Sequence, residues 1–156
     1  KMRSIVKSID VLEDILHQQF TMAQTIIDMS LLPIVEPEIP IDHNDKEDLE
    51  KQLRKILPKY LRNLNGSVIL KLTLPEMPDT YRDLLFYNSC MQIVGLSGGY
   101  TTEEACRRLT QNIDVTASFS RGLSEGLLAT QTDEEFNSRL SQNIADIVEA
   151  SSSKQT

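Results

Sequence analysis

Lys71 stands inside an apolar run, in the stretch SVILKLTLP that covers residues 67–75. Its neighbours are those of a strand buried in a parallel sheet. Burial disfavours the charged form of an amine, and a nearby cation does the same, so both lower the pKa of a lysine and leave a nucleophilic neutral amine. Such an amine attacks a ketone to form an imine. The alternative is a lysine whose stem packs near the strand end while its ammonium group reaches water.

Two glutamates, Glu36 and Glu38, flank a proline in the stretch VEPE. Residues i and i+2 of an extended strand point to the same side, so both carboxylates are expected to face one cavity. Two acids in different surroundings can divide the roles of proton donor and orienting base. The alternative is an acidic surface loop, although the apolar run LLPIV leads directly into the pair.

Two later apolar segments end in residues suited to an anion. In LSGGY, two glycines follow Ser97. Because Gly98 and Gly99 carry no side chain, backbone N–H groups in this loop can approach an anion closely. In SFSRGL, Arg121 follows Ser120 and is a permanent cation that can bind a phosphate through two parallel hydrogen bonds. Each loop alone also fits an ordinary turn or a solvated arginine. Together they predict a phosphate site.

Apolar segments alternate with segments of helical periodicity along the chain. The apolar segments cover residues 1–5, 31–36, 67–73, 91–98 and 115–120. Two amphipathic stripes predict helices between the first three of them, with these apolar residues: Leu12, Leu16, Phe20, Ala23 and Ile27, then Leu49, Leu53, Ile56, Leu57, Tyr60, Leu61 and Leu64. Capping boxes at Thr101 with Glu104 and at Thr132 with Glu135 predict two further helices. The last helix carries an apolar face of Phe136, Leu140, Ile144, Ile147 and Val148.

This alternation predicts an α/β fold with a parallel sheet. The polar residues at the strand ends are spaced at intervals close to the roughly 30 residues of one unit of a (β/α)8 TIM barrel. A barrel has about 250 residues, so four units and a first strand stub make only the second half of one. A doubly wound sheet has the same alternation, but no GxGxxG follows the first strand. Lys1 and Arg3 lie on the stub, among the candidate site residues.

Composition excludes several classes of function. The chain has 156 residues, 40% of them hydrophobic, and a net charge of −7, which argues against nucleic acid and anionic membranes as partners. No stretch reaches the roughly 18 apolar residues of a membrane helix, and the start of the chain lacks the apolar centre of a signal peptide. Two histidines and two cysteines without ligand spacing predict no metal site.

Taken together, these motifs resemble the C-terminal half of a class I fructose-bisphosphate aldolase, closest to the shorter bacterial-type branch. The resemblance runs through KMRS, LLPIVEPEI, ILKLTLP, LSGGY, ASFSRGL and the helix that contains EEFN, in family order. It implies a (β/α)8 barrel of which this chain supplies the end of strand 4 to strand 8. Residues 1–150 are then part of one domain, and residues 151–156 a flexible tail.

The resemblance also implies roles for the candidate residues. Lys71 matches the lysine that forms a Schiff base with the ketose, Glu36 the acid assigned proton transfers, and Glu38 its positioning neighbour. Lys1 matches a lysine that assists at the reacting hydroxyls and keeps the pKa of the nucleophilic amine low. The remaining matches bind substrate and its phosphate: Arg3, Ser97, Gly98, Gly99 and Arg121. The implied lyase splits fructose 1,6-bisphosphate reversibly in glycolysis or gluconeogenesis and needs no metal or other cofactor.

Two departures from the family pattern leave an alternative open. The early strands that supply a catalytic aspartate and another lysine are absent, and so is the C-terminal tyrosine of longer members. The partners expected are therefore sugar phosphates and the N-terminal half of the barrel, with a homo-oligomer as a further option. The alternative is a non-catalytic half-barrel subunit derived from an aldolase. The resemblance implies a cytoplasmic or a plastid protein.

Overall fold

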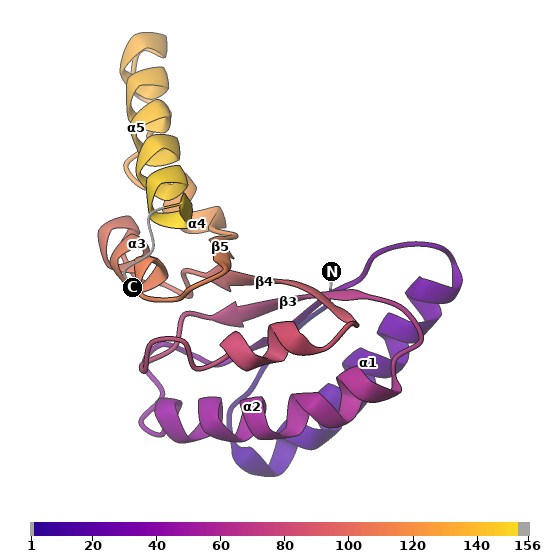
Figure 1. The fold of residues 1–156 in the computed structure, drawn as a ribbon. Coiled ribbons are helices and arrows are strands. Elements are labelled where there is room, and N and C mark those ends of the chain that lie inside the picture. The colour runs from indigo at the N-terminus through magenta and orange to yellow at the C-terminus, as the bar shows by residue number, and fades with distance from the viewer. Residues whose placement is uncertain (1, 153–156) are drawn as a thin grey trace.

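The computed structural model describes residues 2–152, which form a parallel sheet with helices against it (Figure 1). The strand order follows the chain order, β1-β2-β3-β4-β5, and every pairing between neighbouring strands is parallel. The strands are β1 (Met2–Ile5), β2 (Ile34–Glu38), β3 (Val68–Thr73), β4 (Cys90–Leu96) and β5 (Val115–Ala117). This is the alternation expected from the apolar segments.

Helices connect each strand to the next. The long helices are α1 (Leu12–Asp28), α2 (Lys46–Asn63) and the terminal α5 (Asp133–Ser152), and the shorter ones are α3 (Thr102–Thr110) and α4 (Ser120–Leu123). Two 3-10 helices, η1 (Ile9–Val11) and η2 (Arg82–Phe86), were not expected from the sequence. Helices α1 and α2 lie side by side beneath one face of the sheet in Figure 1.

The core lies between the sheet and these two helices. Side chains from both predicted stripes are buried in it, with Leu16 of α1 and Leu57 of α2 fully enclosed. They meet Leu70 and Leu72, the residues of β3 that flank Lys71. Because side chains alternate across a strand, the packing of these two leucines sends Lys71 to the opposite face of the sheet.

The second strand differs from the expected one. It begins at Ile34 rather than at residue 31 and continues through both glutamates to Glu38. Its register with β1 runs from Met2 opposite Val35 to Ile5 opposite Glu38. Its register with β3 covers only Ile34 and Val35. Pro37 therefore lies in the part of β2 that pairs with β1 but not with β3. Proline is tolerated at such edge-like positions because it cannot donate to a ladder. The last strand is also shorter than the expected residues 115–120, because it ends at Ala117 and Ser120 already begins α4.

Both predicted capping boxes begin helices. At α5, the Glu135 N–H donates to the Thr132 hydroxyl (3.2 Å) and the Thr132 N–H donates to the Glu135 carboxylate (2.9 Å). At α3, the Glu104 N–H donates to the Thr101 hydroxyl (3.2 Å), while the Glu104 carboxylate binds arginines of its own helix instead. The first box is therefore reciprocal and the second is half of one.

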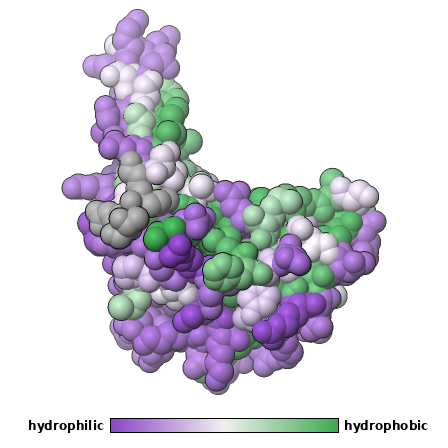
Figure 2. All heavy atoms as spheres, in the orientation of Figure 1, coloured by the Kyte–Doolittle hydropathy of each residue, from purple (hydrophilic) through white to green (hydrophobic). Residues whose placement is uncertain are grey.

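Helix α5 projects away from the sheet and packs mainly against α3 and β5 (Figure 1). Phe136, Ile144 and Val148 of its expected apolar face are exposed, by 38%, 45% and 57%. Apolar side chains line one side of the projecting helix in Figure 2. The helix ends at Ser152, so it extends two residues into the expected flexible tail, and the rest of that tail lies outside the described residues. None of the helices between residues 2 and 152 has the length and apolar character to cross a bilayer.

Candidate active site

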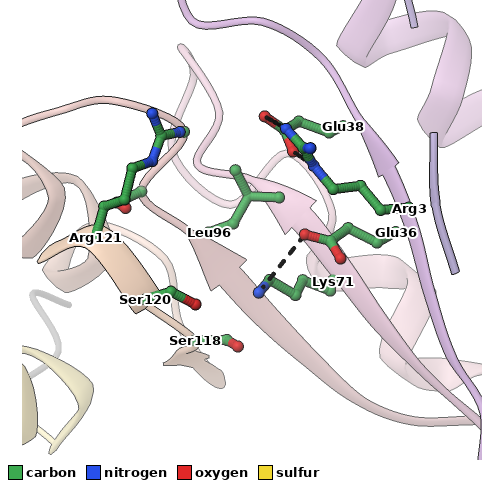
Figure 3. A pocket seen from close by; sticks show the side chains of 10 residues that line it. Arg3, Glu36, Glu38, Lys71, Leu96, Ser118, Ser120 and Arg121 are labelled. Atoms are coloured by element: carbon green, nitrogen blue, oxygen red, sulfur yellow. Dashed lines mark hydrogen bonds and ion pairs between the residues drawn. The ribbon is translucent and has the colours of Figure 1, made fainter. Parts of the chain in front are cut away.

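A cavity of about 400 Å³ opens at the carboxyl ends of the strands (Figure 3). It lies at the edge of the sheet where the reactive groups of parallel α/β folds gather. Four strands and the start of α4 contribute its lining: Arg3, Glu36, Glu38, Lys71, Leu96, Ser97, Gly98, Ser118, Ser120 and Arg121. The structure thus brings together most of the residues singled out from the sequence.

Lys71 and Glu36 face each other across β3 and β2 at the cavity (Figure 3). The Lys71 Nζ lies 3.6 Å from Glu36 Oε1, and the two side chains are 7% and 3% exposed. This separation is an ion pair and is longer than a hydrogen bond. A shift of less than 1 Å brings the carboxylate within proton-transfer distance of the amine or of a group attached to it. The chemistry that this arrangement allows is nucleophilic attack by the amine with an adjacent acid or base.

Glu38 binds Arg3 rather than Lys71. The Arg3 Nε and Nη2 donate to the two carboxylate oxygens of Glu38 at 2.6 and 3.1 Å, a bidentate pair that fixes both groups. These hydrogen bonds raise the pKa of the Arg3 guanidinium. Glu38 is buried while Arg3 is half exposed, so the carboxylate holds the guanidinium at the rim of the cavity. The sequence suggested that both glutamates face one cavity, but it did not indicate this pairing.

The loop after β4 takes a conformation that needs glycine. Gly98 and Gly99 have φ values of +62° and +120°, and a Cβ at Gly98 would lie 2.7 Å from a methyl carbon of Ile41. Ser97 and Gly98 line the cavity, whereas Gly99 is not part of its lining; a Cβ at Gly99 would lie 3.9 Å from an Arg121 nitrogen. Arg121 reaches the same cavity from α4 (Figure 3). Backbone N–H groups and a guanidinium at one end of a cavity can hold an anion.

A set of charges, two of them buried, supports the loops around the site, and we call it the α2 charge cluster: the buried Lys46 and Glu50 with Glu76 and Arg108. The Lys46 Nζ donates to Glu50 Oε1 (2.5 Å) and to the Leu74 carbonyl (2.9 Å), and it lies 3.0 Å from Glu76 Oε1. Arg108 binds Glu76 and the Pro75 carbonyl. The cluster therefore ties the loop that follows Lys71 to α2 and α3.

Burial perturbs two groups at this cluster. It raises the pKa of Glu50, although the hydrogen bond from Lys46 opposes the effect. It also raises the pKa of Tyr100 to about 12. The central carbon of the Arg108 guanidinium lies 4.4 Å from the centroid of the Tyr100 ring. Tyr100 immediately follows the Ser97–Gly99 loop, so this stacking holds the end of that loop.

The predicted set and the observed lining are not identical. Lys1 lies outside the described residues. Ser118 and Leu96 line the cavity but were not singled out, although Ser118 belongs to the ASFS stretch at a strand end. Among residues 2–152, no group of three or more histidine, cysteine, aspartate or glutamate side chains could share a metal ion.

The chain is similar to proteins named class 1 fructose-bisphosphate aldolases. It is 44% identical over 155 residues to those of Synechocystis sp. and Clostridium acetobutylicum, and 39% identical over 153 residues to that of Porphyromonas gingivalis. Each alignment covers 97% of this chain and 52% of the relative. The chain thus spans about half the length of these relatives. No family model matches it.

A solved structure shares the fold. The fructose-bisphosphate aldolase of Plasmodium falciparum, in complex with TRAP and a small-molecule inhibitor, superposes with a TM-score of 0.80 at 19% sequence identity. The superposition covers 99% of this chain and 57% of that chain. Together with the five-stranded parallel sheet, it confirms the predicted fold class, part of a (β/α)8 barrel.

Proposed function

We propose that this chain, whose sequence is similar to class I fructose-bisphosphate aldolases over 97% of its length, carries the Schiff-base lysine of such an enzyme. The reaction is the reversible cleavage of fructose 1,6-bisphosphate to dihydroxyacetone phosphate and glyceraldehyde 3-phosphate, in cytoplasmic glycolysis or gluconeogenesis. One observation carries the proposal: a buried lysine, 3.6 Å from a buried glutamate, in a cavity that two arginines also line.

The first step uses the amine of Lys71. In its neutral form it attacks C2 of the ketose, and the resulting carbinolamine loses water to form an iminium ion. Loss of water needs a proton donor beside the nitrogen, and Glu36 stands there. Before the attack, the Lys71 ammonium gives one proton to Glu36 and becomes the neutral amine. After the attack, a second proton moves from the nitrogen to the former carbonyl oxygen, and Glu36 returns the first proton as that hydroxyl leaves as water. The iminium is the electron sink for carbon–carbon cleavage, so the mechanism requires no metal or other cofactor.

Cleavage needs a base at the C4 hydroxyl. A carboxylate takes that proton as the C3–C4 bond breaks, glyceraldehyde 3-phosphate leaves, and the enamine that remains is protonated and hydrolysed. Glu38 orients Arg3 for this stage through the bidentate pair. By resemblance, Lys1 assists at the same hydroxyls.

Phosphate binding falls to the loops after β4 and β5. Ser97, Gly98 and Gly99 offer a turn whose backbone is open to close approach, and Arg121 offers a fixed charge. The chain as a whole carries a net charge of −7, so attraction of a doubly phosphorylated sugar has to come from such local cations.

A second candidate function, a half-barrel subunit without activity, rests on the exposed apolar face of α5. The chain spans 52% of the relatives, and the exposed apolar face of α5 is of the kind that a further layer of a barrel covers. We propose the N-terminal half of the barrel as the partner for this face, with further copies of the chain as the other option. A subunit that kept the site without using it would show the same partner but no chemistry.

Borohydride trapping separates the two functions. The protein as isolated, with any residues that precede Lys1, is incubated with dihydroxyacetone phosphate, reduced and digested. Mass spectrometry should find the reduced adduct on Lys71, and Lys71→Arg should abolish both the adduct and the cleavage activity, because arginine stays protonated. Lys55→Arg, on the exposed side of α2, is the matched control and should keep both. A folded protein without an adduct would favour the non-catalytic subunit.

A further inference from the structure

The separation of Lys71 and Glu36 depends on how the ends of β3 and β2 are joined. The register between these strands pairs Ile34 with Ile69 and Val35 with Leu70, just before the two reactive residues. Beyond that register, the side chain of Thr73 joins the two segments. It connects the end of β3 to Ile39, the residue that follows β2.

The Thr73 hydroxyl makes two hydrogen bonds to a single residue. It donates to the Ile39 carbonyl at 2.7 Å and accepts from the Ile39 N–H at 3.0 Å. Thr73 is 2% exposed and Ile39 is fully buried, so water does not compete for either bond. Two bonds to one peptide segment fix its orientation as well as its distance.

The two hydrogen bonds between Thr73 and Ile39 fix β2 and β3 on the far side of the reactive pair from the strand register. Glu36 lies between the register at Val35 and the bridge at Ile39, and Lys71 lies between Leu70 and Thr73. Each reactive residue therefore has a fixed contact between the two strands on either side of it in the sequence. The Thr73 methyl carbon also lies 3.8 Å from the point where a side chain would begin at Gly98, so the same residue borders the loop after β4.

We propose that Thr73 is a positioning residue that sets the distance between the Lys71 amine and the Glu36 carboxylate through its hydroxyl. The proposal rests on the function proposed above. Without the hydroxyl, the end of β2 keeps its register with β1 but loses its tie to β3 at this level, so the separation of 3.6 Å between Lys71 and Glu36 is held less firmly. Proton transfer needs about 2.6 to 3.2 Å between heavy atoms, and a displacement of about 1 Å can cost roughly 100-fold in rate.

Two substitutions separate the hydroxyl from the methyl group. Thr73→Val keeps the shape and loses both hydrogen bonds, whereas Thr73→Ser keeps the hydroxyl and loses the methyl. In the protein as isolated, we expect Thr73→Val to lower kcat for fructose 1,6-bisphosphate cleavage by about 10- to 100-fold with KM changed less than about twofold. Borohydride trapping of dihydroxyacetone phosphate on Lys71 should slow by a similar factor. Thr73→Ser should stay within about threefold of the unmodified protein in both assays.

The control is Thr25→Val, on the exposed side of α1. It removes a hydrogen bond from the Thr25 hydroxyl to the Thr21 carbonyl and should leave kcat unchanged. Unchanged kcat in Thr73→Val, equal losses in Val and Ser, or a loss confined to KM would each overturn the proposal. If Thr73→Val does not fold, Thr73→Cys replaces it, because a thiol is a weak donor in a similar volume. An intermediate loss in the cysteine variant supports the proposal, and no loss overturns it. An inactive unmodified protein without an adduct would instead overturn the proposed function itself.

Discussion

Lys46→Met tests whether the α2 charge cluster depends on its buried cation. The Lys46 side chain is 4% exposed and that of Glu50 is 1% exposed, so both charges are removed from water. Methionine has nearly the length of lysine but offers no donor to the Glu50 carboxylate or to the Leu74 carbonyl. The substitution therefore leaves a buried carboxylate without its main partner.

Breaking one side of a buried ion pair costs about 3 to 5 kcal/mol. Glu50 retains the hydrogen bond from the Glu76 N–H at 2.9 Å, so we expect a loss near 3 kcal/mol in the free energy of unfolding. With a urea dependence of about 2 kcal/mol per molar, the midpoint of unfolding falls by about 1.5 M. The double variant Lys46→Met with Glu50→Gln should recover at least about half of this loss, since the remaining amide carries no charge.

The pH dependence provides a second test. Burial raises the pKa of Glu50 in the folded protein above its ordinary value of 4.5, so the folded state binds this proton more tightly than the unfolded state. Stability from this group therefore rises as the pH falls toward 4.5 and declines as the pH rises. The loss caused by Lys46→Met should accordingly shrink between neutral pH and pH 4.5.

Urea titrations followed by circular dichroism at several pH values measure both effects. Lys51→Met is the matched control, because Lys51 is 57% exposed on the same helix and pairs with Glu47. It should change stability by less than about 0.5 kcal/mol. A loss below about 1 kcal/mol for Lys46→Met, or a loss that grows as the pH falls, would refute this account of the cluster.

Three further outcomes follow from the geometry. Gly98→Ala should destabilise the protein by about 1 to 2 kcal/mol and raise KM, since φ is +62° and a Cβ would meet Ile41; an unchanged melting temperature would contradict this. Thr132→Ala should cost about 1 kcal/mol by removing the reciprocal box with Glu135, seen as faster amide exchange in the first turn of α5 but not in α3. Tyr100 should ionise near pH 12 in an ultraviolet titration because burial disfavours its phenolate, and ionisation near pH 10 would show that the group is not buried.

The sequence predicted best those site residues that lie in or directly after an apolar strand segment. Lys71 and Arg121 were singled out because Lys71 interrupts an apolar run and Arg121 follows one, and parallel strands bring their carboxyl ends to one edge. The two glutamates also reach the cavity, but within β2 rather than after it. The expected apolar segment ended at residue 36, whereas the register with β1 carries the strand through Pro37 to Glu38.

The residues that hold the site in place were not predictable. Lys46 occurs in the polar stretch IDHNDKED, where nothing in the pattern distinguishes the one buried charge from its exposed neighbours. Thr73 reads as an ordinary strand residue, because its role depends on Ile39, which is 34 positions away. The apolar face of α5 was correctly recognised as a stripe, but a stripe does not indicate whether its partner lies in the same chain.

The succession of strands has a consequence for synthesis. In this sheet every strand neighbours the one made immediately before it, so each unit can dock as it leaves the ribosome without waiting for remote sequence. Within residues 2–152, only the outer edges of β1 and β5 have no neighbouring strand. Each outer edge offers unpaired backbone groups within this range, and such an edge favours aggregation until another segment covers it.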